Sequence, residues 1–262
     1  MSAWPYGGAS AAIDLGSLHA ALVATGAVSF LSILRPDHPP LPDPCAECFA
    51  LTPLKPHYVF DPALPALPLS KKARRNLREA EQVWQIVRNP PAREAARLAL
   101  HLFDDLAKRR TLSAISHMPR NHFELLLRVP GIESLALRSA DGEWGGVVIA
   151  ACDPGETHML HILTSDRARM TNGAYLLMQA AAELWGRDGP LYLGGAPTGA
   201  DSAGIARFKQ RWANRQSTVH LLTAILDPAR YAELAATRGK PGFFPAYRHP
   251  DGEAAERLSI NA

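Results

Sequence analysis

Two segments decide the fold of this protein, Tyr192-Leu-Gly-Gly-Ala-Pro197 and Gly204-Ile-Ala-Arg-Phe-Lys-Gln-Arg-Trp212. The first is typical of a buried strand that ends in a tight glycine turn. The second is typical of a helix that carries Lys209 between aromatic side chains. A cation near glycine backbone at a strand end is suited to stabilising an oxyanion or a phosphate. The two segments therefore predict a site that handles negative charge.

The residues before and after this pair predict a layered α/β fold. Apolar runs with turn signals between them, typical of an antiparallel meander, occupy residues 132–139, 144–151 and 157–164. A strong helical pattern follows at 172–186, then a strand at 190–193, a helix at 203–213 and a strand at 217–226. This order predicts a mixed, mainly antiparallel central sheet flanked by helices.

The earlier part of the chain predicts shorter elements and then two clear helices. Ser70 is a candidate N-cap for a helix that begins at the next residue. Further helices are expected at 17–25, 91–109 and 121–128, strands at 27–34 and 57–60, and a short helix from about residue 228, before a loose tail. Prolines between residues 36 and 44 exclude helix and central strand, so this run predicts a loop.

Composition indicates a globular protein rather than a disordered one. The chain has 262 residues, 47% of them hydrophobic and 20% charged, with a net charge of +3. The sequence contains neither a leader pattern nor an apolar run long enough to span a membrane, so we expect a cytoplasmic protein without a membrane span. The pair Cys45 and Cys48 has zinc-knuckle spacing, but no second pair exists, and no metal is predicted.

The sequence resembles the GNAT-like acyltransferases, and more narrowly the Fem-type transferases, which attach amino acids to peptidoglycan precursors from aminoacyl-tRNA. The resemblance begins at His57-Tyr-Val-Phe-Asp61, continues through Ser70-Lys-Lys-Ala-Arg-Arg-Asn-Leu77 and ends at Trp212. Its most specific part is Gly194-Gly195 followed by Phe208-Lys209. It implies a GNAT-like fold with a reduced N-terminal strand-containing layer, because Fem proteins carry two full GNAT-like halves and this chain has a shortened first half.

With this resemblance, the expected domains are a reduced N-terminal half-domain at 1–68, a GNAT-like transferase domain at 69–227, and a C-terminal helix and tail at 228–262. The resemblance also implies a catalytic role for Lys209, the lysine of the Phe-Lys motif. A buried cation contributes about 3 kcal/mol to stabilising a tetrahedral oxyanion. The alternative is a solvated helix lysine. Gly194, Gly195 and Phe208 are expected to line the substrate channel, although an ordinary strand-to-helix turn also explains the glycines.

The segment Arg169-Met-Thr-Asn-Gly-Ala174 is expected to bind the donor. GNAT enzymes that use coenzyme A hold its pyrophosphate on backbone amides here, in a pattern of Arg or Gln, two residues, Gly, one residue, then Gly or Ala. Asn172 replaces the first glycine of that pattern. Arg169, Asn172 and Gly173 are therefore expected to hold a phosphate-bearing donor. Asn172 as a simple helix N-cap is the competing explanation.

A basic run follows Ser70, comprising Lys71, Lys72, Arg74, Arg75 and Arg78. Lys72 and Arg75 are candidates for contact with a nucleic-acid backbone or a phosphorylated acceptor. The alternative is a solvated face, and helical geometry keeps all five residues from touching one ligand.

The general base is not singled out by the sequence. His161, Asp166 and Tyr175 are candidates to deprotonate an attacking amine. His158 and His161 have odd spacing on one expected strand, which predicts that they face opposite sides of the sheet. A structural histidine is the alternative for either.

These observations predict an acyltransferase that forms an amide by moving an aminoacyl group from aminoacyl-tRNA onto an amine. The acceptor is expected to be a small molecule or a peptide. No cofactor is expected. One alternative is an acyl-CoA-dependent N-acyltransferase of the same fold, with acyl-CoA as co-substrate. Another is a non-catalytic GNAT-like module that binds tRNA or protein.

Overall fold

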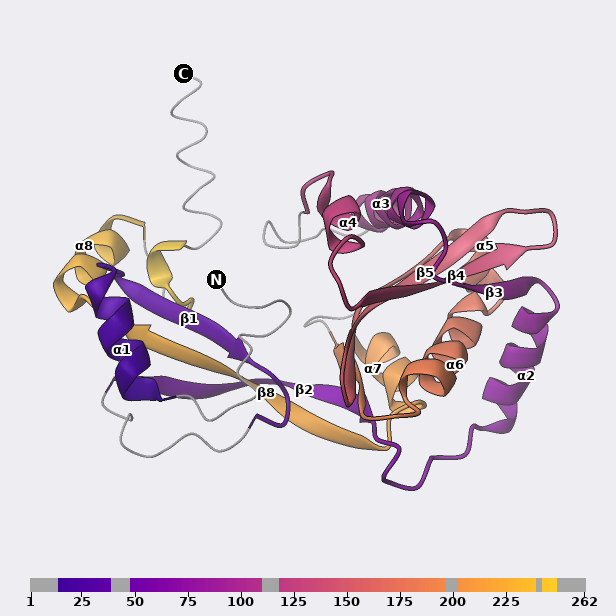
Figure 1. Ribbon diagram of the computed structural model, residues 1–262, viewed down its shortest axis with the longest axis horizontal. Helices are drawn as coiled ribbons and strands as arrows, with labels where there is room; N and C mark the ends of the chain where they lie inside the picture. The colour runs from indigo at the N-terminus through magenta and orange to yellow at the C-terminus, as the bar shows by residue number, and fades with distance from the viewer. Residues whose placement is uncertain (1–13, 39–47, 110–117, 197–201, 239–241, 249–262) are drawn as a thin grey trace, which may run out of the picture. The chain divides into compact units, whose positions relative to one another are not determined.

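The computed structural model describes residues 14–38, 48–109, 118–196, 202–238 and 242–248 (Figure 1). Residues 39–44 of the predicted proline loop, Cys45 and the predicted tail beyond residue 248 lie outside these ranges. The described elements are α1 (Leu15–Ala24), β1 (Ser29–Leu34), β2 (Ala50–Phe60), α2 (Lys71–Glu81), β3 (Trp84–Arg88), α3 (Ala92–Arg109), α4 (His122–Leu126), β4 (Ile132–Ser139), β5 (Trp144–Asp153), β6 (Glu156–Thr164), α5 (Asp166–Met170), α6 (Gly173–Trp185), β7 (Leu191–Gly195), α7 (Ser202–Gln210), β8 (Arg215–Ile225), α8 (Pro228–Arg238) and the 3₁₀ turn Ala246–Arg248.

The chain divides into two compact units. Unit 1 combines Met1–Lys55 with Thr218–Ala262, and unit 2 is the continuous segment Pro56–Ser217. These boundaries differ from the expected 68/69 and 227/228 because strands β2 and β8 each run from one unit into the other. A sequence pattern marks the ends of a strand more readily than a division within it.

Unit 2 is built on a sheet whose strand order is β2-β7-β6-β5-β4-β3. All neighbouring strands pair antiparallel except β6 and β7, which are parallel. The parallel ladder contains only two pairs, Thr157 with Leu191 and His158 with Tyr192. The last residues of β6 therefore extend beyond its pairing with β7, and the predicted mixed, mainly antiparallel sheet is confirmed.

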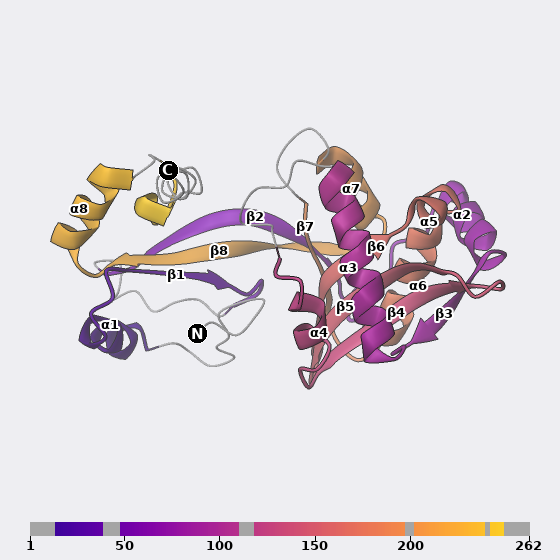
Figure 2. The same ribbon diagram turned by 90° about the horizontal axis from the view of Figure 1, so that it is seen from above.

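Helices cover both faces of this sheet, α3 and α4 on one and α2 and α6 on the other (Figure 1). Strand β5 is buried on both faces, since Val147 and Ile149 face the first helical layer and Val148 and Ala150 the second. Figure 2, seen from above, shows α3 lying across the strands. Burial on both faces explains the continuous apolar run in this strand.

Unit 1 has a smaller core around β1 and β8, which pair antiparallel from Ser29 with Ile225 to Leu34 with His220. The buried apolar residues that form this core are Leu15, Leu34, Phe49, Leu222 and Ala224. Helix α1 begins after Asp14, whose carboxylate accepts hydrogen bonds from the amides of Gly16 and Ser17. Side-chain capping of this kind stabilises a helix start by about 1 kcal/mol.

Most predicted elements are confirmed, and three regions differ. Strand β3 follows α2 without a glycine or proline between them, so no turn signal marked it. Helix α5 is a single turn capped by Ser165, whose Oγ accepts from the amide of Ala168 at 3.1 Å. Strand β2 begins at Ala50, well before the predicted residue 57, and contains Pro53 and Pro56. Proline occurs in strands only where its nitrogen has no ladder partner, which made this segment unlike a strand in sequence.

Candidate active site

A cavity in unit 2 lies where α3, β6, α5, α6 and α7 converge. It encloses about 520 Å³, and we call it the Lys209 cavity. Its lining residues are Leu102, Leu106, Arg109, Ile162, Leu163, Thr164, Arg169, Ala174, Ile205, Phe208 and Lys209. The cavity therefore brings together three of the predicted site residues, Lys209, Phe208 and Arg169, with walls from helices that the sequence did not connect.

Lys209 is held against the glycine pair. Its Nζ donates a hydrogen bond to the carbonyl oxygen of Gly195 at 2.7 Å. A Cβ placed on Gly194 would lie 3.4 Å from the same Nζ. The side chain is partly buried, so the alternative of a fully solvated helix lysine does not describe it. A protein carbonyl and a glycine surface thus fix one cation at the cavity.

The glycine pair forms a bulged strand end, not the simple turn expected from the sequence. Gly195 pairs with His57 and Gly194 with Tyr58, whereas Val59 pairs with Tyr192, so Leu193 is an extra residue in β7. Gly194 has φ +74°, in the left-handed region that favours glycine. The bulge redirects the backbone, which is a common use of such irregularities beside active sites.

Two arginines of the cavity share one carboxylate. Arg109, at the end of α3, and Arg169, in α5, both donate to Oδ1 of Asp166. Asp166 was predicted as a base, but here it is an ion-pair partner and 69% of its side chain is exposed. Asp166 does not line the cavity. The three cations of the cavity outnumber this neighbouring carboxylate, which favours an anionic ligand.

The turn between α5 and α6 differs from a side-chain cap. Asn172 occupies the N-cap position of α6 with φ +60°, as the competing explanation had it, but its side chain makes no capping bond; its Nδ2 donates to Glu79 Oε2 at 3.0 Å. Asparagine is the residue besides glycine that most readily adopts this conformation, which explains the departure from the glycine pattern. Gly173 allows close packing, because an added Cβ would lie 2.6 Å from Leu137 Cδ1.

Tyr175 lies beside the cavity among aromatic side chains rather than in its lining. Its ring packs edge-on to Phe208 at 5.4 Å, and its hydroxyl accepts from Arg211 Nη1. The Arg211 guanidinium also lies over the Tyr175 ring, 5.8 Å from its centroid. This arrangement fixes the orientation of Phe208, which does line the cavity.

His161 and His158 lie on the same face of the sheet, so the prediction of opposite faces is wrong. His161 pairs with Ile149 and Met159 with Ala150, which leaves Leu160 as an extra residue that resets the alternation of β6. Burial, with a smaller contribution from His122, lowers the pKa of His161 to about 4. His158 stacks on Tyr192 with ring centroids 4.4 Å apart. Neither histidine lines the Lys209 cavity.

The basic run on α2 lies elsewhere. Lys72 and Arg75 are exposed, and Arg75 pairs with Glu79 at 3.4 Å on the same helix. Neither residue lines the Lys209 cavity. The structure therefore separates these two predicted substrate contacts from Lys209.

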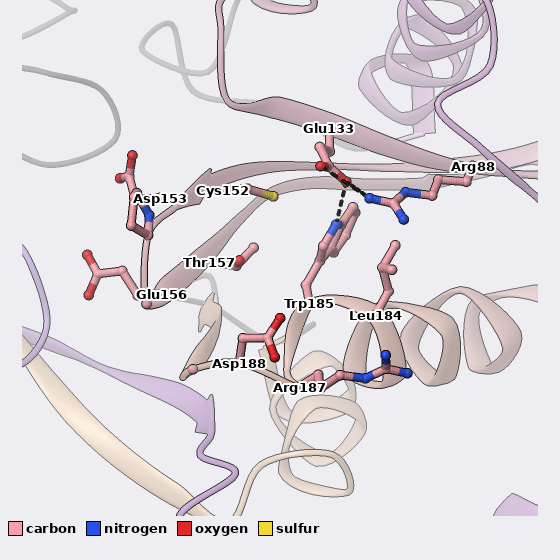
Figure 3. A pocket seen from close by; sticks show the side chains of 13 residues that line it. Arg88, Glu133, Cys152, Asp153, Glu156, Thr157, Leu184, Trp185, Arg187 and Asp188 are labelled. Atoms are coloured by element: carbon pink, nitrogen blue, oxygen red, sulfur yellow. Dashed lines mark hydrogen bonds and ion pairs between the residues drawn. The ribbon is translucent and has the colours of Figure 1, made fainter.

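A second cavity in unit 2 has the opposite charge. It encloses about 490 Å³, and we call it the Glu133 cavity. Figure 3 shows the Glu133 carboxylate between Arg88, 3.2 Å away, and the indole of Trp185, whose Nε1 donates at 3.0 Å. Its other charged lining residues are Asp153, Glu156, Arg187 and Asp188. Burial raises the pKa of the Cys152 thiol here to about 11, so the thiol is protonated at neutral pH.

The described part of the chain shows neither a metal centre nor a membrane-spanning helix. There, no cluster of three or more His, Cys, Asp or Glu side chains is arranged to hold a metal ion. Likewise, none of the described helices combines the length and apolar character needed to cross a membrane. Cys48 is exposed, and its predicted companion Cys45 lies outside the described residues.

Comparison with known proteins gives structural matches only. No family model and no curated protein matches the sequence. FemX matches with a TM-score of 0.60 and 11% identity, covering 84% of this chain and 77% of FemX. The C-terminal domain of a putative lysylphosphatidylglycerol synthetase from Agrobacterium fabrum matches with a TM-score of 0.55 and 16% identity, covering 85% and 74%. L-PGS from Bacillus licheniformis matches with a TM-score of 0.52 and 14% identity, covering 79% and 71%.

These matches establish the fold. The chain has the GNAT-like, Fem-type fold that the sequence predicted, with the mostly antiparallel sheet and flanking helices described above. At sequence identities of 11–16%, the similarity to these proteins concerns only the arrangement of the backbone. The reaction has to be argued from the residues of the Lys209 cavity.

Proposed function

We propose that the protein is an acyltransferase that moves an aminoacyl group from aminoacyl-tRNA onto an amine and forms an amide. The observation that carries the proposal is the Lys209 ammonium, held 2.7 Å from the Gly195 carbonyl at the edge of a cavity with apolar walls. Names among the structural matches, FemX and lysylphosphatidylglycerol synthetase, support this direction.

In the proposed reaction, the amine nitrogen attacks the ester carbonyl and a tetrahedral oxyanion forms. The new carbon–nitrogen bond stays, the ester carbon–oxygen bond breaks, and the proton of the amine passes overall to the ribose oxygen that leaves. Lys209 is the proposed stabiliser of the oxyanion, a contribution of about 3 kcal/mol for a well-placed donor. The activated ester already supplies the driving force, so orientation and charge stabilisation are the main tasks of the protein.

The proposed donor site lies at the other cations of the cavity. Arg109 and Arg169, which both contact Asp166, are the proposed partners of a phosphate of the donor, in competition with that carboxylate. Ala174 lines the same cavity at the start of α6, and helix N-termini attract phosphate through their amides. Asn172 and Gly173 shape this turn. Lys72 and Arg75 are proposed, at most, to contact distant parts of a tRNA.

The proposed acceptor is a small-molecule or peptide amine. His161 and Tyr175 are the proposed candidates for the general base that deprotonates this amine. His161 is unprotonated at pH 7 because burial lowers its pKa to about 4, so it is able to accept a proton but is a weak base. Tyr175 has its hydroxyl bound to Arg211. An amine that is already neutral needs neither residue before attack.

A second candidate is transfer from an acyl-CoA. The observation behind it is that β6 extends past its two pairs with β7, next to the α5–α6 turn, where Asn172 has φ +60°, a conformation that favours glycine. We propose that this turn would bind the pyrophosphate of coenzyme A or, equally, a phosphate of tRNA. Geometry alone therefore supports a phosphate-bearing donor of either class.

A donor comparison tests the proposal. Purified protein is incubated with a mixed pool of radiolabelled aminoacyl-tRNA and an amine mixture, and amide formation is followed by resistance to mild base. Acetyl-CoA binding is measured in parallel by calorimetry. We expect amide formation from charged tRNA and no acetyl-CoA binding. Tight acetyl-CoA binding with turnover of acyl-CoA would replace the tRNA donor, whereas tRNA binding without transfer from either donor favours a non-catalytic module.

A further inference from the structure

The walls of the Lys209 cavity are apolar on two sides. Leu102 and Leu106 lie one turn apart on α3. Ile205 and Phe208 lie one turn apart on α7, and Ile162 and Leu163 of β6 add to the lining. Residues four or three apart share a helix face, so each helix presents a pair of apolar side chains to the cavity. Apolar walls of this kind favour an apolar ligand, because each CH₂ group buried against them leaves water.

The charged lining residues of the cavity all have the same sign. Arg109, Arg169 and Lys209 are basic, and the described lining contains no carboxylate. Asp166 lies next to two of these cations and is engaged by both. A positively charged side chain placed in this space would meet like charges and find no acidic partner in the lining, at an electrostatic cost that rises as water is excluded.

We infer that the cavity selects an aminoacyl group with an uncharged, apolar side chain, such as leucyl, and rejects a cationic one, such as lysyl. The inference rests on the proposed function and names the substrate class of the same site. In this arrangement the apolar side chain occupies the leucine- and isoleucine-lined walls, while Arg109 and Arg169 hold the phosphate. The volume of about 520 Å³ lies within the range of small-molecule sites.

Two matched probes test the inference without turnover. Hydrolysis-resistant adenosine 5′-monophosphates carrying either leucine or lysine in 3′-amide linkage differ only in the aminoacyl side chain, and calorimetry gives the Kd of each. We expect the leucyl compound to bind wild-type protein at least tenfold more tightly than the lysyl compound. Equal affinity, or tighter lysyl binding, overturns the inference while leaving transfer from charged tRNA intact.

Two variants of Leu106 test whether the cavity lining causes the preference for the leucyl compound over the lysyl compound. Leu106→Glu introduces a carboxylate and should move the ratio of the two Kd values at least tenfold toward the lysyl compound. Leu106→Gln has the same size without the charge and should leave the lysyl compound disfavoured. An unchanged ratio in a folded Leu106→Glu protein overturns the inference. Binding of neither compound to wild-type protein that also transfers no aminoacyl group overturns the proposed function, and the inference with it.

Discussion

The Lys209 cavity and the Glu133 cavity, both in unit 2, are similar in volume and opposite in charge. The Lys209 cavity has three cations on apolar walls, with one carboxylate beside them. The Glu133 cavity has four acidic side chains and two arginines. Two of the acidic side chains in the Glu133 cavity already bind other side chains of the protein. Glu133 contacts Trp185 and Arg88, and Glu156 lies 3.2 Å from His158.

The difference shows why charge alone does not identify a site. The Glu133 carboxylate links β4 to β3 through Arg88 and to α6 through Trp185, and such groups are costly to bury without partners. In the Lys209 cavity, the cations lie beside a backbone bulge and the start of a helix, where a ligand is able to approach. Substitutions in one cavity, matched by the same change in the other, distinguish residues that bind a ligand from residues that stabilise the fold.

The largest expected effect comes from Lys209→Met, which removes the cation and keeps the apolar stem. Transfer activity should fall by about 10²–10³-fold, the loss typical of one oxyanion donor. Steady-state kinetics and circular dichroism measure activity and folding. Lys108→Met, which removes an exposed lysine bound to Asp105, is the control and should keep full activity. A folded Lys209→Met protein with full activity would contradict the proposed catalytic role.

The next effect concerns the donor. Arg109→Gln and Arg169→Gln should each raise the KM for the donor about tenfold, because each removes a charge-assisted hydrogen bond to phosphate. The matched change in the other cavity is Arg187→Gln, an exposed lining residue, which should leave KM unchanged. Equal KM values in all three variants would place the donor phosphate outside the Lys209 cavity.

A third comparison uses two glycines with similar backbone. Gly194 has φ +74° beside Lys209, and Gly155 has φ +85° in the Glu133 cavity with open space around its Cβ position. Alanine at either position should lower the free energy of unfolding by about 1–2 kcal/mol through backbone strain. Only Gly194→Ala should also lower activity, because its methyl group would lie 3.4 Å from the Lys209 ammonium and occupy space beside it. Urea unfolding and kinetics measure the two effects, and equal activity in both variants would show that the reaction does not need this space to stay open.

The smallest expected effect is a pH dependence of stability from His161, which lies between the two cavities along β6. Its folded-state pKa of about 4 is below the usual 6.5 because of burial, so the unfolded chain takes up the proton first. The free energy of unfolding should therefore fall as pH decreases from about 6.5 toward 4. Urea unfolding at pH 7 and pH 5 measures this. His161→Gln should reduce the fall, whereas the same change at exposed His101 should not; equal slopes in both would contradict the assignment.

Much of the fold was predictable because local patterns agree with it. The meander from residue 132 to 164 has alternating apolar segments and glycine turns, and Ser70 begins α2 as expected. The closeness of Lys209 to the glycine pair also followed from the sequence, since one short connection separates β7 from α7. The role of that lysine stays a prediction.

What the sequence did not predict depends on long-range packing. Arg109 ends a helix whose pattern shows one apolar stripe, and nothing local indicates that it meets Asp166 more than fifty residues later. Bulges at Leu160 and Leu193 each add one residue to a strand, which reverses the side of the sheet on which later side chains lie. Such irregularities carry little local signal, because the extra residue is an ordinary leucine in both strands.

The pairing of β1 with β8 has a consequence for folding during synthesis on the ribosome. Ser29 cannot meet Ile225 until the ribosome has made the whole of the continuous unit 2. At about 5–20 residues per second, the nascent β1 waits on the order of ten seconds or more for its partner. During that time Leu15 and Leu34 lack their final neighbours, while unit 2 is free to fold, so unit 2 should be complete before unit 1.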